Sequence, residues 1–456
     1  MTPRSKRLVE YLSTLSKGTL PPQLLESATI ALMDSVGCGL YGSRQRCGQI
    51  VNAFVLSEKS HGSATLYGCA FPVTPARAAL ANGTSTHGFE FDDTLYSQAH
   101  AGAVVVSSAL AAAEQAQASG SQFLAGIVAG YEMMGRLVQA LGIDHSIRGY
   151  HTTGVAGPVA ATIAAGTVMG LDADQLLSAV GNACSAASGI KAFIQGTGGM
   201  TKRMHAGRAA ESGVVACELA RLGFTGPLEA IDGPFGLLQV IGTPGAHPEL
   251  LDEALGAAFV INNTWVKLYP CCAGNFTALN ALESLKHDHG FTAAQVKEIH
   301  IHTFRRGVVQ NGGRNPKDSM AAQYSLPYCA AVAVAKNARD PAVFSEAQLQ
   351  DPAIRELAAR TVLSVDDELE RIYPAQLGAR VEVSLMNGQI VEATVLDPHG
   401  SPAHPVKPAE IEAKFRQLAA SVKSPATIDR ILAAVRALPV APSLDALSSA
   451  LREENI

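Results

Sequence analysis

Small apolar residues at helical spacing dominate the chain from about Leu8 to Val260. Charged residues make up only 16% of the sequence, so most helical faces here must pack on other helices rather than face water. Alanine and glycine on the facing sides permit close helix approach. The spacing predicts helices over Ser27–Cys38, Ala76–Ala81, Ser107–Ala118, Phe123–Leu141, Ala156–Met169, Asp174–Ala187 and Ala206–Leu222. The pattern indicates a large, well-buried and mostly helical protein.

The sequence changes character after Asn262. Val296–Phe304 is rich in β-branched residues, and Ala379–Met386 and Gln389–Val395 flank Asn387-Gly388, which is a strong hairpin signal. This middle section also carries helical patterns, at Ala278–His287 and Tyr324–Lys336. Past Ser401 the patterns are helical again, over Pro408–Val422, Ile428–Leu438 and Leu444–Leu451.

The 456 residues exceed what one hydrophobic core usually holds, so we expect two domains. The fold class predicted is mostly α: a large all-α domain with an inserted, smaller α+β domain. Residues 1–264 form the first part of the helical domain, residues 265–400 the α+β domain, and residues 401–456 the C-terminal part of the helical domain.

Composition argues against several classes of partner. The net charge of −5 weakly disfavours nucleic acid, and no uninterrupted apolar run is long enough to span a bilayer. The N-terminus is basic but lacks the apolar core of a secretory signal, so we expect a cytoplasmic protein. The eight cysteines are scattered and none forms a C-x-x-C pair, which favours reduced thiols over a zinc or redox motif.

A glycine-rich basic run, Gly196–Arg208, interrupts the small-residue helices. Its glycines let backbone N–H groups approach a ligand closely. Lys202 and Arg203 can pair with carboxylate or phosphate, and His205 can be charged or neutral near pH 7. Because the flanking residues are apolar, we expect the run to line a pocket for a small anion rather than an outer surface.

A second polar cluster lies in Asn82–Thr94, where Glu90, Asp92 and Asp93 fall within four residues. His87 precedes the acids and His100 follows them. The acids could be a solvated face, or Asp92 and Asp93 could bind magnesium, although no further acidic group is obvious elsewhere. Alternatively they orient histidines for proton transfer. We expect no metal.

Three shorter segments carry further candidates. His151 lies at the entry to an apolar helix, where a lone histidine is more often structural. Cys271 and Cys272 are adjacent, a spacing that seldom gives a relaxed disulfide, so packing plus one pocket-facing thiol is favoured. Tyr324 and Tyr328 precede a buried helix and, taken alone, would be core or edge aromatics.

Together these motifs resemble the MmgE/PrpD family, which includes 2-methylcitrate dehydratase, cis-aconitate decarboxylase and iminodisuccinate epimerase. The resemblance extends in order over nearly the whole chain. It implies a large all-α domain made of N- and C-terminal segments, a smaller α+β lid, a homodimer and no cofactor. The motifs are N-G-T-x-x-H-G-F-E-x-D-D, the stretch Lys202–Gly213, the run Phe224–Gly236, and K-x-Y-P-C-C from Lys267.

The resemblance also assigns roles to individual positions. Glu90 stands where cis-aconitate decarboxylase has an aspartate, and Cys272 where it has a histidine. The alanine after His100 replaces the commoner proline. Positions that match functional residues of the family are Thr94, His100, His151, Lys202 in the glycine-rich loop, Lys267 and Tyr328.

The family reactions all add or remove a proton next to a carboxylate and must stabilise the resulting charge. His100 is the candidate general base or acid, and His151 or Tyr328 the second proton carrier. We therefore expect a lyase that dehydrates or decarboxylates a small di- or tricarboxylate. The alternatives are a dicarboxylate epimerase, a carboxylate-binding protein without turnover, and a helical scaffold. The predicted catalytic residues are His100, His151, Lys202 and Tyr328, and the predicted substrate-binding residues are Glu90, Asp93, Thr94, Arg203, His205, Lys267 and Cys272.

Overall fold

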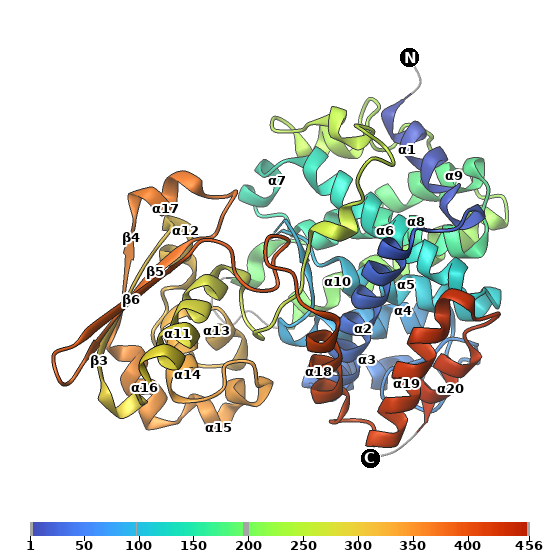
Figure 1. Ribbon diagram of the computed structural model, residues 1–456. Coiled ribbons are helices and arrows are strands. Elements are labelled where there is room, and N and C mark those ends of the chain that lie inside the picture. Colours follow the sequence, from blue (N-terminus) through green and yellow to red (C-terminus); the bar gives the residue numbers. More distant parts are fainter. Residues whose placement is uncertain (1–2, 97, 195–199, 454–456) are drawn as a thin grey trace. The chain divides into compact units, whose positions relative to one another are not determined.

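The computed structural model describes residues 3–96, 98–194 and 200–453 (Figure 1). The chain divides into two compact units. The helical unit comprises residues 1–265 and 407–456, and the α+β unit comprises residues 266–406. Helices make up most of the described residues, which confirms the prediction of a mostly α protein.

The helical unit contains long helices from both ends of the sequence. A two-stranded antiparallel pair, β1 (Thr94–Leu95) with β2 (Thr264–Trp265), is its small sheet. The α-helices are α1 Arg4–Leu12, α2 Pro22–Ser43, α3 Arg46–Ser57, α4 Pro75–Thr86, α5 Ala101–Ala116, α6 Gly120–Leu141, α7 Asp144–Ile147, α8 Thr152–Met169, α9 Ala173–Cys184, α10 Thr201–Arg221, α18 Pro408–Ala419, α19 Pro425–Ala437 and α20 Asp445–Arg452.

Helix α8 lies at the centre of this unit and packs against α5, α6 and α10. Small residues allow the backbones to approach closely, as expected from the sequence. A Cβ on Gly213 of α10 would lie 2.4 Å from the Cβ of Ala161 of α8, and a Cβ on Gly207 would lie 2.1 Å from the carbonyl oxygen of Leu80 of α4. Side chains at these glycines would force the helices apart.

Helix α8 is also the one described helix that is long and apolar enough to cross a membrane. Of the residues of α8, 94% are buried within the protein. Burial on all sides explains the apolar composition, because a helix that is covered all round has no polar face.

Local signals account for several helix boundaries. Asp172 and Gln175 form a capping box at the start of α9. Gly223, with a φ of +91°, follows the end of α10.

The C-terminal helices are joined to the N-terminal part of the unit by a buried ion pair. Lys414 of α18 donates from Nζ to Asp34 Oδ1 of α2 at 2.6 Å. The C-terminal helices therefore belong to the same core as α2.

The α+β unit is built on a four-stranded sheet in the order β4-β3-β5-β6. Strand β3 (Val296–Thr303) pairs in parallel with β4 (Thr361–Val365) and antiparallel with β5 (Ala379–Leu385). Strands β5 and β6 (Ile390–Val395) form the predicted hairpin around Asn387-Gly388, and Gly388 has a φ of +89°. The helices of this unit are α11 Phe276–His289, α12 Arg305–Asn311, α13 Ser319–Gln323, α14 Leu326–Ala335, α15 Glu346–Leu349, α16 Pro352–Ala359 and α17 Asp367–Ile372.

Candidate active site

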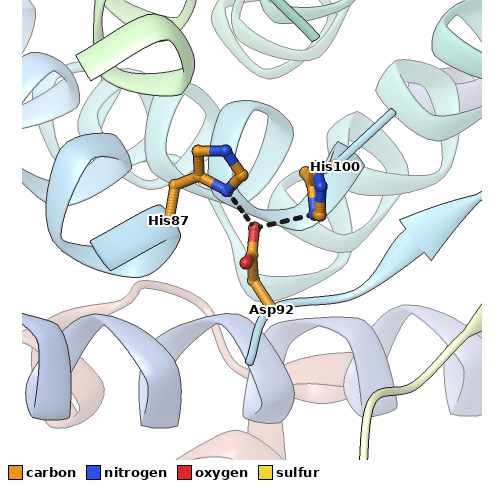
Figure 2. Close-up of side chains that lie close together, drawn as sticks. All are labelled: His87, Asp92 and His100. Carbon is orange, nitrogen blue, oxygen red and sulfur yellow. Dashed lines mark hydrogen bonds and ion pairs between the residues drawn. The ribbon is translucent and has the colours of Figure 1, made fainter. Parts of the chain in front are cut away.

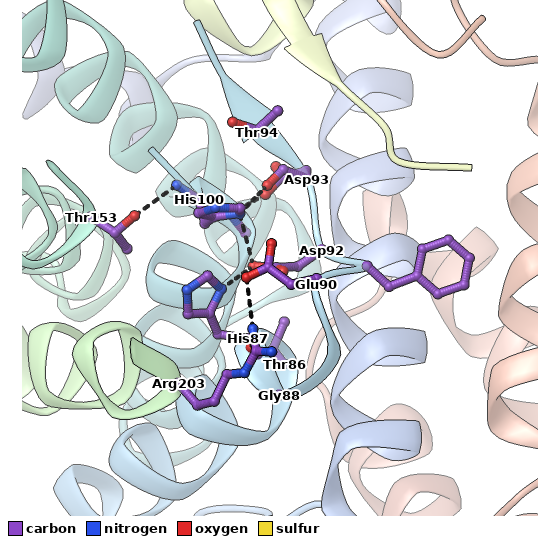
Figure 3. Close-up of polar contacts among 12 residues, drawn as sticks. Thr86, His87, Gly88, Glu90, Asp92, Asp93, Thr94, His100, Thr153 and Arg203 are labelled. Carbon is purple, nitrogen blue, oxygen red and sulfur yellow. Dashed lines mark hydrogen bonds and ion pairs between the residues drawn. The ribbon is translucent and has the colours of Figure 1, made fainter. Parts of the chain in front are cut away.

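The segment between α4 and α5 brings the acidic cluster and two histidines into the interior of the helical unit (Figure 3). Helix α4 ends at Thr86, and a short 3-10 helix over His87–Phe89 follows. Glu90 then adopts a left-handed backbone with a φ of +55° and ends this short helix. The cluster is buried, so the interpretation as a solvated acidic face is wrong.

Asp92 is the centre of a hydrogen-bonded triplet (Figure 2). Its Oδ2 lies 2.8 Å from His87 Nδ1 and 3.3 Å from His100 Nδ1. Burial by itself would raise the pKa of Asp92, but the two imidazoles outweigh it and hold that pKa well below its usual range. Asp92 is therefore a buried carboxylate that accepts from two histidines.

His100 occupies the position just before helix α5. Its Nδ1 lies 2.8 Å from the backbone carbonyl oxygen of Asp93. A carbonyl oxygen can only accept a hydrogen bond, so the proton is on Nδ1 and the neutral ring carries its lone pair on Nε2. The backbone N–H of His100 donates to Thr153 Oγ1 at 3.1 Å, which fixes the residue from helix α8.

The side chain of His100 makes no capping hydrogen bond to α5. Asp93 takes that role, because its Oδ1 accepts from the backbone N–H of Gly102 at 2.9 Å. The side chain of His100 is therefore not needed as the cap of α5. Tyr131 donates to the other oxygen of Asp93 at 2.5 Å. Burial, reinforced by Asp34, raises the pKa of Asp93 to about 7.

His87 belongs to the site although the sequence analysis assigned it no role. Its ring centroid lies 4.4 Å from that of His100 and 6.0 Å from that of His151. With the Nδ1 proton directed at Asp92, Nε2 carries a lone pair, and it has no hydrogen-bond partner among the described residues. Burial lowers the pKa of His87 well below its ordinary value, so the ring is neutral at pH 7.

His151 and His205 form a second pair of imidazoles. Their Nδ1 atoms lie 2.9 Å apart, so one ring donates and the other accepts. Burial lowers the pKa of His151, and the neighbouring His87, His100 and His205 lower it further. Burial and then Lys202 lower the pKa of His205. His151 precedes α8 as His100 precedes α5, so each presents its imidazole at a helix start.

Lys202 and Arg203 lie in the first turn of α10 rather than in a loop, which corrects the assignment taken from the family motif. Both are buried. Lys202 Nζ forms an ion pair with Glu90 Oε1, and Arg203 Nη1 lies 2.7 Å from the same oxygen. The first three glycines of the basic run, at 196, 198 and 199, lie outside the described residues. Two cations from α10 therefore face the Glu90 carboxylate.

The remaining predicted residues have local partners. Thr94, in β1, donates from Oγ1 to the backbone carbonyl of Ala99 at 3.2 Å. In the α+β unit, Tyr328 is buried and donates from its hydroxyl to the Val343 carbonyl at 2.8 Å, and burial raises its pKa. Lys267 is also buried. Cys272 is half-buried, and its backbone N–H donates to the Gln323 carbonyl at 2.9 Å.

Known families and curated proteins match nearly the whole length of the chain. The family model of the MmgE/PrpD N-terminal domain matches residues 6–249, and that of the C-terminal domain matches residues 269–439. The chain belongs to the MmgE/PrpD family. Among curated relatives, a cis-aconitate decarboxylase-like protein of Aspergillus oryzae is 29% identical over 98% of this chain and 97% of its own length.

Two further relatives of this MmgE/PrpD chain have similar coverage. Cis-aconitate decarboxylase of Aspergillus terreus is 26% identical over 97% of this chain and 96% of the relative. Human cis-aconitate decarboxylase is 25% identical over 98% of this chain and 95% of the relative. The similarity therefore covers both units of the chain.

The residue types of the His87–Asp92–His100 triplet are ones that also bind metal ions. His87, Asp92 and His100 place ligand-type atoms within 4.8 Å of one another. However, the contact of His100 Nδ1 with the Asp93 carbonyl requires a proton on that nitrogen, and a protonated nitrogen cannot coordinate a metal. The triplet fits a hydrogen-bonded acid–base group better than a metal centre.

The helical unit thus gathers, around Asp92 and Glu90, four histidines and two cations from α10. Neutral imidazoles can take up or relay a proton, and the cations can attract an anion. His87 was detectable as part of the N-G-T-x-x-H motif. The contact of His87 with Asp92 agrees with the alternative interpretation that the acids of this segment orient the histidines that flank them.

Proposed function

We propose that this chain is a lyase that acts on a small di- or tricarboxylate, with cis-aconitate as the first candidate substrate. The observation on which the proposal rests is the buried His100. Its Nδ1 contacts the Asp93 carbonyl and the Asp92 carboxylate, which leaves the lone pair on Nε2. Relatives named cis-aconitate decarboxylase over nearly the full length support the substrate class.

The chemistry requires one proton transfer at carbon. In decarboxylation a C–C bond breaks, carbon dioxide leaves, the electron pair stays on the carbon skeleton, and a carbon takes up a proton. We assign that proton to His100 Nε2, which must first take it up from water, with the His151–His205 pair as the second carrier. Lys202 and Arg203 would attract the substrate carboxylates, because both are buried cations at this site.

The proposal also includes roles for the α+β unit, on the basis of the family resemblance. We assign Tyr328, Lys267 and Cys272 to substrate contacts or proton transfer, and we propose that this unit acts as a lid. A homodimer that needs no cofactor and works in the cytoplasm completes the proposal. These assignments rest on matching motif positions alone.

One observation favours a second candidate. Cys272 occupies the position at which cis-aconitate decarboxylase has a histidine, so one imidazole of that enzyme is missing. Dehydration of a hydroxy-tricarboxylate, or epimerisation of a dicarboxylate, would use the same His100 and the same cations. The first experiment must therefore distinguish the reactions.

The experiment is an NMR assay in deuterium oxide with cis-aconitate, citrate, 2-methylcitrate and iminodisuccinate supplied separately. We expect cis-aconitate to lose carbon dioxide and to give a five-carbon unsaturated dicarboxylate that carries deuterium. Dehydration of a citrate, or exchange without net conversion, would assign the chain to the second candidate. No change in any of the four acids would contradict the proposal.

Two treatments test the roles of the residues in the same assay. Lys202→Ala should lower kcat/KM by at least about tenfold, because a desolvated charge-assisted contact is worth roughly 1.5–3 kcal/mol. Dialysis against EDTA should leave the rate unchanged. Full activity of the variant would remove Lys202 from the site, and recovery of a chelated enzyme only with added metal would contradict a metal-free reaction.

A further inference from the structure

We propose that Asp92 and His87 are positioning residues for proton transfer: Asp92 stabilises the proton that His100 accepts, and His87 holds Asp92 in place for it. The inference rests on the proposed function for its catalytic consequence. The contact of His100 with Asp92, on which the inference is built, does not depend on which acid is the substrate.

The charges around Asp92 favour this role. At rest the carboxylate faces the Nδ1–H groups of two imidazoles, and Nδ1 of His100 is shared between Asp92 Oδ2 and the Asp93 carbonyl. The carbonyl sets the tautomer, and the carboxylate supplies the negative charge. When Nε2 of His100 takes a proton, a buried carboxylate gains an adjacent imidazolium, which is favourable in a low-dielectric interior.

His87 restrains the orientation of the Asp92 carboxylate. Its Nδ1 makes the shorter of the two contacts to Oδ2, at 2.8 Å, while Oδ1 is buried with no hydrogen-bond partner among the described residues. The backbone of His87 is itself held, because its carbonyl accepts from Arg203 Nη1 at 3.4 Å. Without the His87 donor, Asp92 would keep only the longer contact to His100.

An alternative role for His87 is direct contact with the substrate through Nε2, the atom that lacks a partner. Asparagine and glutamine separate the two roles, because their amide nitrogens lie near the positions of Nδ1 and Nε2 of histidine, respectively. His87→Asn keeps a donor toward Asp92, whereas His87→Gln moves the donor away from Asp92 and places it near the Nε2 position.

The first experiment compares kcat and KM of the two variants on whichever acid is turned over. We expect His87→Asn to stay within about threefold of the parent and His87→Gln to lose about tenfold or more in kcat at similar KM. The matched control is His145→Gln, a buried histidine whose Nε2 partner is Thr152 Oγ1 at 3.0 Å, which should retain activity. The reverse order of the two His87 variants would overturn the proposal in favour of substrate contact. Equal kcat per folded molecule in both would leave only a structural role.

The second experiment needs no turnover. The groups that face His100 are Asp92 and Asp93 from its own segment, His87 from the end of α4 and His151 from the start of α8. The ring nitrogens of His100 are followed against pH by NMR in ¹⁵N-histidine-labelled protein, with His100→Asn to assign the signal. In Asp92→Asn, the loss of the carboxylate charge should move proton uptake by His100 to lower pH.

An unchanged His100 titration in a folded Asp92→Asn protein would overturn the role of Asp92. If Asp92→Asn does not fold, the titration is run on His87→Gln, where a smaller shift in either direction is expected and no shift contradicts the proposal. A shift without activity toward any acid would leave the positioning role intact and reject the proposed function. The two failures are therefore distinguishable.

Discussion

Glu90 shows how a single residue sets the charge of the site. Its carboxylate, in a left-handed turn, pairs with Lys202 and Arg203, and all three side chains are buried. Sequence reasoning treated the two cations as partners of the substrate and did not anticipate this internal counter-ion. A carboxylate that pairs with two buried cations reduces the cost of burying them.

Glu90→Gln removes this counter-ion with little change in shape. We expect the variant to lose roughly 3–5 kcal/mol of unfolding free energy, since a buried charge pair is broken from one side. Added citrate should restore part of the loss by binding to the folded state. Denaturant unfolding with and without citrate measures both effects. A variant as stable as the parent would show that Glu90 does not balance these cations.

Asp93 makes stability depend on pH in a defined direction. Burial is the main cause that raises its pKa from the ordinary value of 3.8 to about 7 in the folded protein. Between these pH values the folded state holds a proton that the unfolded state has released. This contribution to stability is present at low pH and falls by roughly 1.4 kcal/mol per pH unit as the pH rises toward 7, then levels off.

Asp93→Asn tests that dependence, because asparagine keeps an oxygen for the Gly102 N–H and cannot ionise. Between pH 5 and pH 7 the unfolding free energy of the parent should fall relative to that of the variant. Chemical denaturation at several pH values gives the difference. Parallel curves over this range would contradict a raised pKa for Asp93.

At the scale of elements, His100 immediately precedes helix α5 and His151 immediately precedes helix α8. Neither histidine side chain makes a capping hydrogen bond to its helix. Asp93 satisfies the first turn of α5 instead. His100→Asn should therefore melt close to the parent, while its rate falls by roughly 100- to 10,000-fold through loss of Nε2. Asp93→Ala should lower the melting temperature, since a lost cap costs about 1 kcal/mol. Early melting of His100→Asn with normal turnover would reverse these roles.

Periodicity and turn chemistry predicted the elements that make local contacts. The predicted elements include α2, α4, α5, α6, α8, α9, α10 and the β5–β6 hairpin, because their signals lie within each segment, whereas helices α3 and α7 were not predicted. Strand β4 (Thr361–Val365) was not, because it pairs in parallel with β3 across a long connection. In the same way, the motifs named Glu90 and His100, whereas the Glu90–Lys202 pair and the contacts of Asp92 depend on tertiary packing.

At the scale of the whole molecule, Lys414 joins the C-terminal helices to the segment that carries the site. Its ammonium contacts Asp34 Oδ1 at 2.6 Å and the Phe91 carbonyl at 2.7 Å, one residue before Asp92. Lys414→Met should lower the unfolding free energy by roughly 3–5 kcal/mol, and Asp34→Leu added to it should recover part of that loss. Denaturant unfolding measures both. A loss under about 1 kcal/mol, typical of an exposed pair, would contradict a structural role.

The protein carries a net charge of −5, yet its candidate site gathers histidines and two cations, so anion binding there should be coupled to protons. Burial lowers the pKa of His87, His151 and His205, and these rings are neutral at pH 7 in the free protein. A bound tricarboxylate favours their charged forms and raises those pKa values. Binding should therefore take up protons near pH 7, and affinity should weaken as the pH rises.

Calorimetry with propane-1,2,3-tricarboxylate, an acid that has no double bond or hydroxyl to react, tests this coupling. The binding enthalpy should differ between two buffers of different ionisation enthalpy, and the difference gives the number of protons taken up. His205→Asn should reduce the number of protons taken up, because it removes one of the coupled rings. The control is His247→Asn: His247 is exposed and lies beside Glu249, so its replacement should leave the number unchanged. Equal enthalpies in both buffers, with binding intact, would show that the anion does not bind against these histidines.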